Sequence, residues 1–157
     1  MIARLAQEAL LEEVYTTPKP GLVDCHDTGA HTDMDCQTFE KSAAAIAPYI
    51  AVMYELGGRW MDAPQGLFCA LRPLGLQAEQ AMLAATDGVN THKGAIFTFA
   101  ILAAAGHCAV QDVRLTPQLI GAYAAKMTRE PLEREFAAIH GRMPKTHGEV
   151  LYCKYGI

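Results

Sequence analysis

The segment Ala85-Thr-Asp-Gly-Val-Asn-Thr-His-Lys-Gly-Ala-Ile-Phe-Thr-Phe-Ala100 passes from a loop into a helix within a few residues. Asp87-Gly88 is typical of a turn, because glycine accepts a positive φ without steric cost. Asn90 and Thr91 can each cap a helix start with a side-chain oxygen. Residues 95–105 form an almost uninterrupted apolar run of strong helix formers, which predicts a helix buried on most sides.

The polar residues at the start of this helix predict an anion-binding site. Backbone N–H groups at a helix N-terminus and the helix dipole both attract anions. Lys93 adds a positive charge, and His92 adds a group that can exchange a proton near neutral pH. A solvated first turn that binds nothing fits the same residues equally well.

A long polar loop, residues 17–35, is the second candidate region. It carries Lys19, Asp24, His26, Asp27, His31, Asp33 and Asp35. A loop of this length is uncommon in a compact domain unless it has a task. Its carboxylates suit Mg²⁺, which keeps several waters and bridges to phosphates. The alternative is that the aspartates cap turns and helices, and we expect Asp35 or Thr38 to cap the next helix.

The composition predicts one globular domain over residues 1–157. The chain is 51% hydrophobic and 19% charged, and its net charge of -4 argues against a nucleic-acid partner. No apolar run reaches the length of a membrane span, and the N-terminal residues lack the apolar core of a secretory signal. The five cysteines are odd in number and contain no Cys-x-x-Cys pair, which favours free thiols and a cytoplasmic protein.

The periodicity of apolar residues predicts an all-α fold. Strand alternation and hairpin signals are absent from the sequence. We expect a single-domain bundle of seven or eight short helices, at residues 2–14, 38–56, 65–71, 76–85, 95–105, 116–127 and 130–140, with a possible helix near the C-terminus. Pro48 should kink or split the second helix, Gly57-Gly58 should end it, and Gly106 should cap the helix before His107.

Three separated stretches resemble the triphosphoribosyl-dephospho-CoA synthase family, which serves citrate lyase and malonate decarboxylase. They are Thr17-Pro-Lys-Pro-Gly-Leu-Val-Asp24 with Gly29-Ala-His31 and Asp33-Met-Asp35; Gly88-Val-Asn-Thr-His-Lys-Gly94; and Thr146-His-Gly-Glu149 with Tyr152 and Tyr155-Gly156. Members of that family are close to twice as long. The resemblance therefore implies that this chain corresponds to an N-terminal half.

The resemblance implies a reaction in which ATP and 3′-dephospho-CoA give 2′-(5″-triphosphoribosyl)-3′-dephospho-CoA and adenine. Glycosyl transfers of this kind pass through an oxocarbenium-like state that carboxylates stabilise. The implied catalytic candidates are His31, Asp33, His92, His147 and Glu149. The implied substrate-binding candidates are Lys19, Gly21, Asn90, Thr91, Lys93 and Gly94. The implied Mg²⁺ ligands are Asp24, Asp33 and Asp35.

Other functions fit the same sequence. The chain could be a catalytically impaired, nucleotide-binding helical fragment. It could also be a non-functional helical fragment whose missing half would cover the core, to which exposed apolar patches or obligate dimerisation as a homodimer would point. A metal-dependent hydrolase built on the polar loop is a weaker alternative, because His26 and His31 do not have the spacing of a zinc-binding helix.

Overall fold

The computed structural model describes residues 1–110, 115–139, 142–144 and 147–156 of the chain. Within these ranges there are six helices and no strand, which confirms the predicted all-α class. The helices are α1 (Ile2–Tyr15), α2 (Cys36–Arg59), α3 (Pro64–Ala85), α4 (Lys93–Val110), α5 (Pro117–Ile139) and α6 (His147–Tyr155). None of the helices in this part of the chain is long and apolar enough to cross a membrane.

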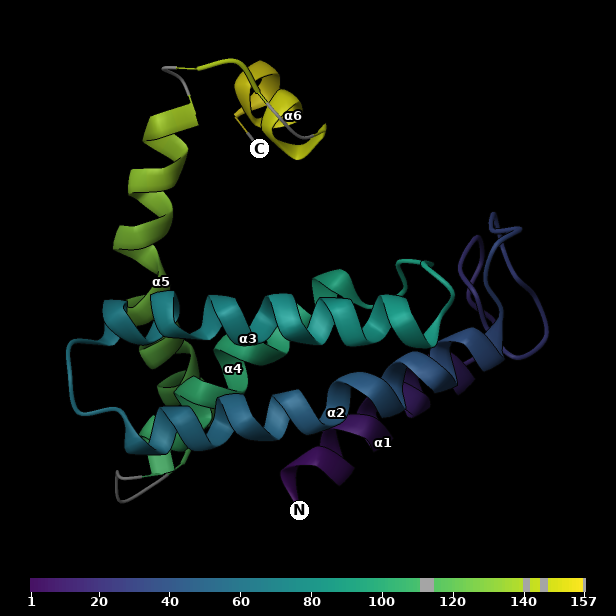
Figure 1. Ribbon diagram of the computed structural model, residues 1–157, viewed down its shortest axis with the longest axis horizontal. Coiled ribbons are helices and arrows are strands. Elements are labelled where there is room, and N and C mark those ends of the chain that lie inside the picture. The colour runs from purple at the N-terminus through teal and green to yellow at the C-terminus, as the bar shows by residue number, and fades with distance from the viewer. Residues whose placement is uncertain (111–114, 140–141, 145–146, 157) are drawn as a thin grey trace.

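Helix α2 is the centre of the fold. It packs against α1, α3 and α4, and α5 packs across α3 and α4. Figure 1 shows α1 to α4 side by side in one elongated body, from which α5 leads away to α6. The apolar faces of α1 to α5 meet in a single core, whose largest fully buried side chains include Ile46, Ile50, Met53, Leu67, Met82 and Met127.

Fewer helices form in the described ranges than the seven or eight expected, because Pro73 and Pro131 lie inside helices and not between them. Pro48, Pro73 and Pro131 are interior residues of α2, α3 and α5. The expected breaks between residues 71 and 76 and between 127 and 130 are therefore wrong. An interior proline costs about 3 kcal/mol through a lost hydrogen bond and a clash. Packing offsets this cost, since α3 buries apolar side chains on both sides of its proline.

The glycines expected to end helices lie inside helices instead, and Gly57 serves close packing. Gly57 is buried inside α2, which continues to Arg59. A Cβ atom on Gly57 would lie only 2.3 Å from the carbonyl oxygen of Ala104, so glycine lets the backbones of α2 and α4 approach. Gly106 likewise lies inside α4, and His107 is a helical residue whose ring stacks on Tyr54 at 4.1 Å.

Candidate functional site

Two of the three motif segments lie at the same end of the α1–α4 body. Residues 16–35 connect α1 to α2, and residues 86–92 connect α3 to α4. Figure 1 shows both connections at one end of the body, because these helices run alternately up and down. The second connection is hydrogen-bonded to α2, since Thr91 and His92 both contact Ser42.

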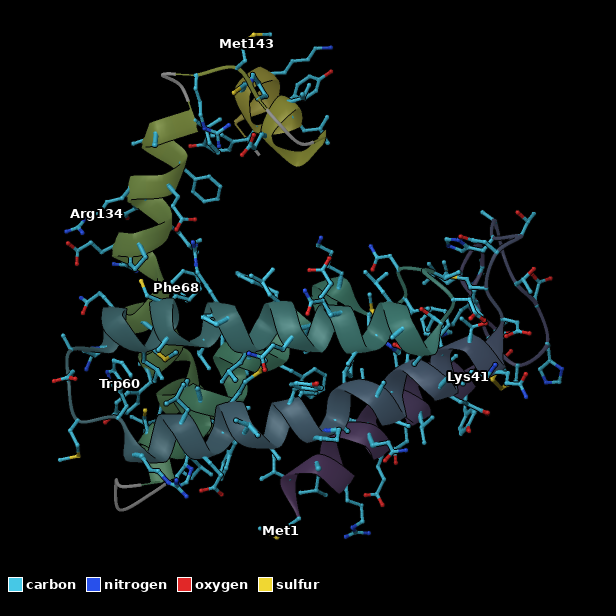
Figure 2. The ribbon with its side chains drawn as sticks, viewed as in Figure 1. Met1, Lys41, Trp60, Phe68, Arg134 and Met143 are labelled. Carbon is cyan, nitrogen blue, oxygen red and sulfur yellow. A yellow bond between two sulfur atoms is a disulfide. The ribbon has the colours of Figure 1, made fainter. Side chains whose placement is uncertain are left out.

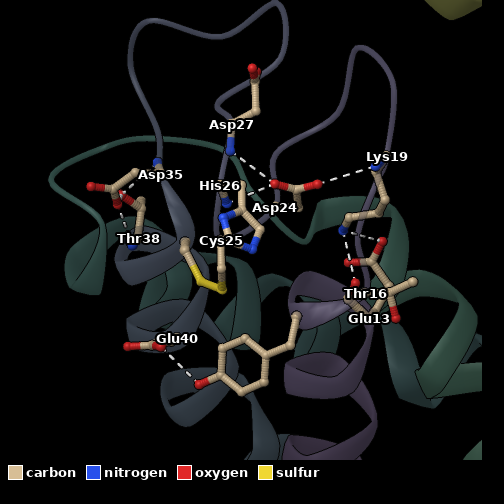
Figure 3. The surroundings of a disulfide bond; sticks show 12 residues. Glu13, Thr16, Lys19, Asp24, Cys25, His26, Asp27, Asp35, Thr38 and Glu40 are labelled. Carbon is tan, nitrogen blue, oxygen red and sulfur yellow. Dashed lines mark hydrogen bonds and ion pairs between the residues drawn. A yellow bond between two sulfur atoms is a disulfide. The ribbon is translucent and has the colours of Figure 1, made fainter.

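Asp24 organises the first of these loops. Its carboxylate is only 5% exposed. It accepts hydrogen bonds from the backbone N–H groups of His26 (2.8 Å), Asp27 (2.9 Å) and Lys19 (3.1 Å), as Figure 3 shows. Together with a hydrogen bond to the Thr17 side chain, they hold the pKa of the Asp24 carboxyl far below its usual range. The Asp24 carboxylate therefore holds the loop in shape, and its oxygens already accept hydrogen bonds from donors of the loop itself.

Two glycines allow the same loop to fold back on itself. Gly21 and Gly29 both have positive φ, of 79° and 60°. The carbonyl oxygen of Gly21 accepts the N–H of Ala30, and a Cβ on Gly29 would lie 2.5 Å from the carbonyl carbon of Gly21. Gly21 was predicted to bind substrate. In the structure, the turn requires a glycine here because of its positive φ.

Asp35 caps α2, as one of the two alternatives predicted. Its Oδ1 accepts from the backbone N–H of Thr38 (2.8 Å), and the Thr38 hydroxyl accepts from the N–H of Asp35 (3.3 Å), so the helix begins at Cys36. These contacts lower the pKa of Asp35. Asp33 is exposed, and its carboxylate lies 3.6 Å from Nδ1 of His31.

The predicted metal ligands do not form a ready-made metal cluster. Among the described residues, no three His, Cys, Asp or Glu side chains lie together so that they could hold a metal ion. The loop does form a pocket of about 350 Å³, lined by Thr28, His31, Thr32, Asp33, Met34, Asp35 and Thr38. We call it the acidic pocket. A cation held here would need ligands from a substrate or from water in addition to these carboxylates.

Both candidate phosphate-binding lysines are paired with glutamates. Nζ of Lys19, whose side chain is 12% exposed, contacts Oε1 of Glu13 at 3.0 Å and its carbonyl oxygen at 2.8 Å. Nζ of Lys93, whose side chain is 59% exposed, contacts Oε1 of Glu79 at 2.6 Å. Lys93 and Glu79 are the polar end of a pocket of about 370 Å³ between α3 and α4, which shares no lining residue with the acidic pocket.

The start of α4 is capped largely as the sequence predicted. Oδ1 of Asn90 accepts from the backbone N–H of Lys93 at 3.3 Å. The hydroxyl of Thr91 instead donates to Oγ of Ser42 at 2.7 Å, across to α2. Gly94 is exposed in the first turn, and no atom lies within 4 Å of the position a Cβ would take. The first turn of α4 is therefore open on the side of Gly94.

His92 is buried where the α3–α4 connection packs on α2, with only 5% of its surface exposed. Its Nδ1 lies 2.6 Å from Oγ of Ser42, and the ring edge packs on Phe39 at 5.0 Å. The Ser42 hydroxyl, which accepts from Thr91, can donate to Nδ1, and in that tautomer the neutral ring carries its proton on Nε2. Nε2 is buried and has no hydrogen-bond partner among the described residues.

The environment keeps the His92 ring neutral. Burial lowers the pKa of His92, and the negative charge of Glu13 opposes that shift more weakly. A buried N–H without a partner is uncommon and calls for an explanation. A neutral imidazole that presents its N–H in this way can donate a hydrogen bond to a group that reaches it.

Ser42 was missed by the sequence reasoning. It is fully buried, and it is the only residue that joins the Thr91–His92 pair to α2 among the described hydrogen bonds. The available signal was its position on the apolar face of α2, three residues after Phe39 and four before Ile46. A polar side chain on a core face usually marks a specific hydrogen-bond partner.

The third motif segment does not join the other two. His147 begins α6, Thr146 lies outside the described residues, and Glu149 pairs with Arg142 at 3.0 Å. Helix α6 lies at the far end of α5 (Figure 1). In Figure 2, Met143, just before this segment, lies far from Lys41 near the start of α2. The structure therefore does not bring the predicted catalytic residues His147 and Glu149 to the remaining candidates.

The expectation of five free thiols is wrong. Cys25 and Cys36 form a disulfide, whereas Cys69, Cys108 and Cys153 are free. The Cα atoms of the pair are 5.2 Å apart, because the loop returns to its own beginning where α2 starts. The spacing of the two cysteines in the sequence carries no sign of this approach.

The fold and the site together define an all-helical protein with a polar, histidine-containing site at one end of four packed helices. The chain belongs to the family described as CitG, ATP:dephospho-CoA triphosphoribosyl transferase, whose family model matches residues 1–157.

The chain is also similar to synthases of several bacteria. The chain is 42% identical to a probable 2-(5″-triphosphoribosyl)-3′-dephosphocoenzyme-A synthase of Vibrio cholerae, in a match covering 100% of this chain and 51% of the relative. It is 39% identical to the probable synthase of Streptococcus mutans, covering 99% and 57%. It is 42% identical to the Escherichia fergusonii synthase, covering 87% and 46%. The chain thus spans about half the length of these relatives, and no solved structure matches it.

Proposed function

We propose that this chain carries the transfer of a 5-triphosphoribosyl group from ATP to the 2′-hydroxyl of 3′-dephospho-CoA, with release of adenine. The observation that carries the proposal is the buried, neutral His92 of the family motif at residues 88–94, which packs on α2 and whose Nε2 has no hydrogen-bond partner among the described residues. The names of the relatives support the same reaction. Binding of ATP and of dephospho-CoA is part of the proposal.

The lysines and the start of α4 supply the triphosphate site in this proposal. Lys93 and Lys19 would exchange their glutamate partners for phosphate oxygens, with which ammonium groups make strong charged hydrogen bonds. The backbone N–H groups around Asn90, Thr91 and Gly94 add donors at a helix N-terminus, where the dipole favours negative charge.

The histidine and the acidic pocket supply the chemistry. His92 would donate a hydrogen bond from Nε2–H to the departing adenine, while the Ser42 hydroxyl holds Nδ1 and fixes the ring. The proton lost by the 2′-hydroxyl ends on the released adenine. The carboxylate of Asp33, beside His31, would stabilise positive charge on the ribose carbon. His147 and Glu149 stay predictions, since they would have to approach from α6.

Mg²⁺ is proposed as a companion of the triphosphate. Asp24 and Asp35 are engaged in closing a turn and capping α2, so Asp33 is the predicted ligand whose carboxylate faces the acidic pocket without such a task. Mg²⁺ often binds through one or two carboxylates, with waters and phosphate oxygens completing its coordination. Removing the cation with EDTA should weaken ATP binding; unchanged binding would remove Mg²⁺ from the proposal.

The deciding experiment measures free adenine by liquid chromatography after incubation with ATP and dephospho-CoA. Adenine should appear only when both substrates are present. ATP binding without adenine release would restrict the function to nucleotide binding. Calorimetric titration with ATP measures binding separately.

Two variants test the assigned roles. Lys93→Ala should weaken ATP binding about tenfold or more, because a charged hydrogen bond contributes about 1.5–3 kcal/mol. His92→Ala should lower turnover more than ATP affinity. The matched control is Lys126→Ala, an exposed lysine on α5 far from both loops. Equal effects of the Lys93 and Lys126 substitutions would refute the phosphate role.

The cellular setting belongs to the same proposal. We propose a cytoplasmic protein whose product is the prosthetic-group precursor of citrate lyase or malonate decarboxylase. A homodimer is proposed as well, since Leu5, Leu102 and Leu115 are exposed around an apolar groove between α1 and α4. Light scattering after size-exclusion chromatography gives the oligomeric state directly.

A further inference from the structure

The disulfide pair occupies a particular place in the polar loop. Cys25 is exposed and directly follows the buried Asp24, and Cys36 is the first residue of α2. Figure 3 shows the bond between them beside the hydrogen bonds of Asp24 and Asp35. The bond therefore closes a ring from residue 25 to residue 36 at the surface, where small thiols and disulfides can reach it.

The ring builds the acidic pocket almost by itself. The lining residues inside the ring are Thr28, His31, Thr32, Asp33, Met34 and Asp35. The remaining one, Thr38, stands in the first turn of α2, just beyond the ring. The shape of this pocket therefore depends on how closely the two ends of the ring are held together.

Each end of the ring has its own anchor. The Asp24 carboxylate holds the first end through the N–H groups of His26 and Asp27. The capping box of Asp35 and Thr38 holds the second end. Residues 32–34 lie between these anchors, and the Cys25–Cys36 bond joins one anchor to the other. Opening the bond leaves both anchors in place, but the disulfide then no longer fixes the distance between them.

We propose that Cys25 and Cys36 are a reversible thiol–disulfide site that sets the shape of the acidic pocket: closed when oxidised, loosened when reduced. Oxidation needs a low-molecular-weight disulfide such as glutathione disulfide. One cysteine thiolate attacks it and releases one small thiol; the second cysteine thiolate attacks the mixed disulfide and releases another. The two protons of the cysteines end on the released thiols, and excess thiol reverses both steps.

The pair differs from the other three cysteines, which are free and separate in the structure. A reducing compartment keeps such a pair mainly as thiols, and oxidising conditions close it. The site would operate whether or not the chain transfers a triphosphoribosyl group, because it acts on the loop itself.

The test uses the full chain equilibrated in glutathione buffers of different redox poise. Free thiols are trapped by alkylation, and the linked and alkylated peptides are measured by mass spectrometry. Cys25 and Cys36 should appear as one linked pair in oxidising buffer and as two alkylated thiols in reducing buffer. Persistent alkylation of both in oxidising buffer, or separate glutathione adducts on each, would overturn the proposal.

Hydrogen exchange of residues 28–34 tests the effect on the pocket. Exchange should be about tenfold slower in the oxidised chain than in the reduced chain, because the closed ring restricts local opening. Cys25→Ser should remove the redox dependence, whereas Cys69→Ser should preserve it. Equal exchange rates in the two redox states would show that the bond does not shape the pocket and would refute that part of the proposal.

Discussion

Replacing Ser42 with alanine tests the buried hydrogen-bonded chain on which the site depends. Ser42 is fully buried in α2, 2.6 Å from Nδ1 of His92 and 2.7 Å from the Thr91 hydroxyl. Alanine leaves Nδ1 buried without its donor, which costs about 2 kcal/mol. Thr91 is only partly buried and can turn to water, so its loss adds little.

A gain in helix stability offsets part of this cost. Alanine has a higher helix propensity than serine, by about 0.5 kcal/mol. The net expectation is a loss of about 1.5 kcal/mol in the free energy of unfolding. For a chain of this size that corresponds to a melting temperature lower by about 3–6 °C. Urea unfolding followed by circular dichroism at 222 nm measures the first quantity, and a thermal scan measures the second.

The matched control removes a hydroxyl from an exposed helical position. Thr98 in α4 donates to the carbonyl oxygen of Gly94 at 3.1 Å and faces solvent. Thr98→Ala should change stability by less than about 0.5 kcal/mol. A Ser42→Ala protein as stable as the Thr98→Ala protein would refute the claim that Ser42 holds a buried histidine in place.

Three further predictions follow from the structure. Burial lowers the pKa of His92 below its ordinary 6.5, so the unfolded chain binds the proton more readily than the folded chain. The free energy of unfolding should therefore fall as the pH drops from about 7 to 5. His92→Gln should flatten this pH dependence, measured by urea unfolding at each pH. A slope unchanged in the variant would mean that another group titrates. Gly57→Ala should cost about 2 kcal/mol, because its Cβ would meet the backbone of α4. Gly121→Ala on α5, with no atom near its Cβ position, should be neutral or stabilising; similar melting temperatures for the two would contradict the close approach. Reducing the Cys25–Cys36 bond should lower stability by about 3 kcal/mol for its sequence separation of 11. Reductant should leave the melting temperature of the Cys25→Ser/Cys36→Ser variant unchanged, and the same shift in that variant would assign the effect to other thiols.

The helical architecture was readable from the sequence because its signals are local. Apolar residues at helical spacing predicted the all-α class, and Asp35, one of the two caps expected, caps α2, although the helix begins at Cys36 and not at residue 38. The prolines led to wrong predictions of helix ends, because the energetic cost of a proline is local whereas the packing that offsets this cost is tertiary. A proline therefore predicts the end of a helix more often than it ends one in a packed core.

The site was only partly readable, for a related reason. The two loops were identified from polar residues that are close in the sequence. Ser42 reaches His92 only when α2 packs against residues 86–92, and Cys25 reaches Cys36 only when the loop folds back. Neither contact leaves a mark in the spacing of residues. The placement of α6 likewise depends on α5, so the distance of Glu149 from the other candidates was not visible beforehand.

Because both lysines are paired with glutamates, the charge of an anion affects whether it can displace them. Lys19 and Lys93 each already have a carboxylate neighbour, so a monovalent anion would replace one negative charge with another and gain almost nothing. A ligand of high negative valence would compete better for each lysine, and the displaced glutamate would then repel it unless a cation came with it. Under the proposed function, these neutral ion pairs would therefore favour a polyphosphate over chloride or acetate.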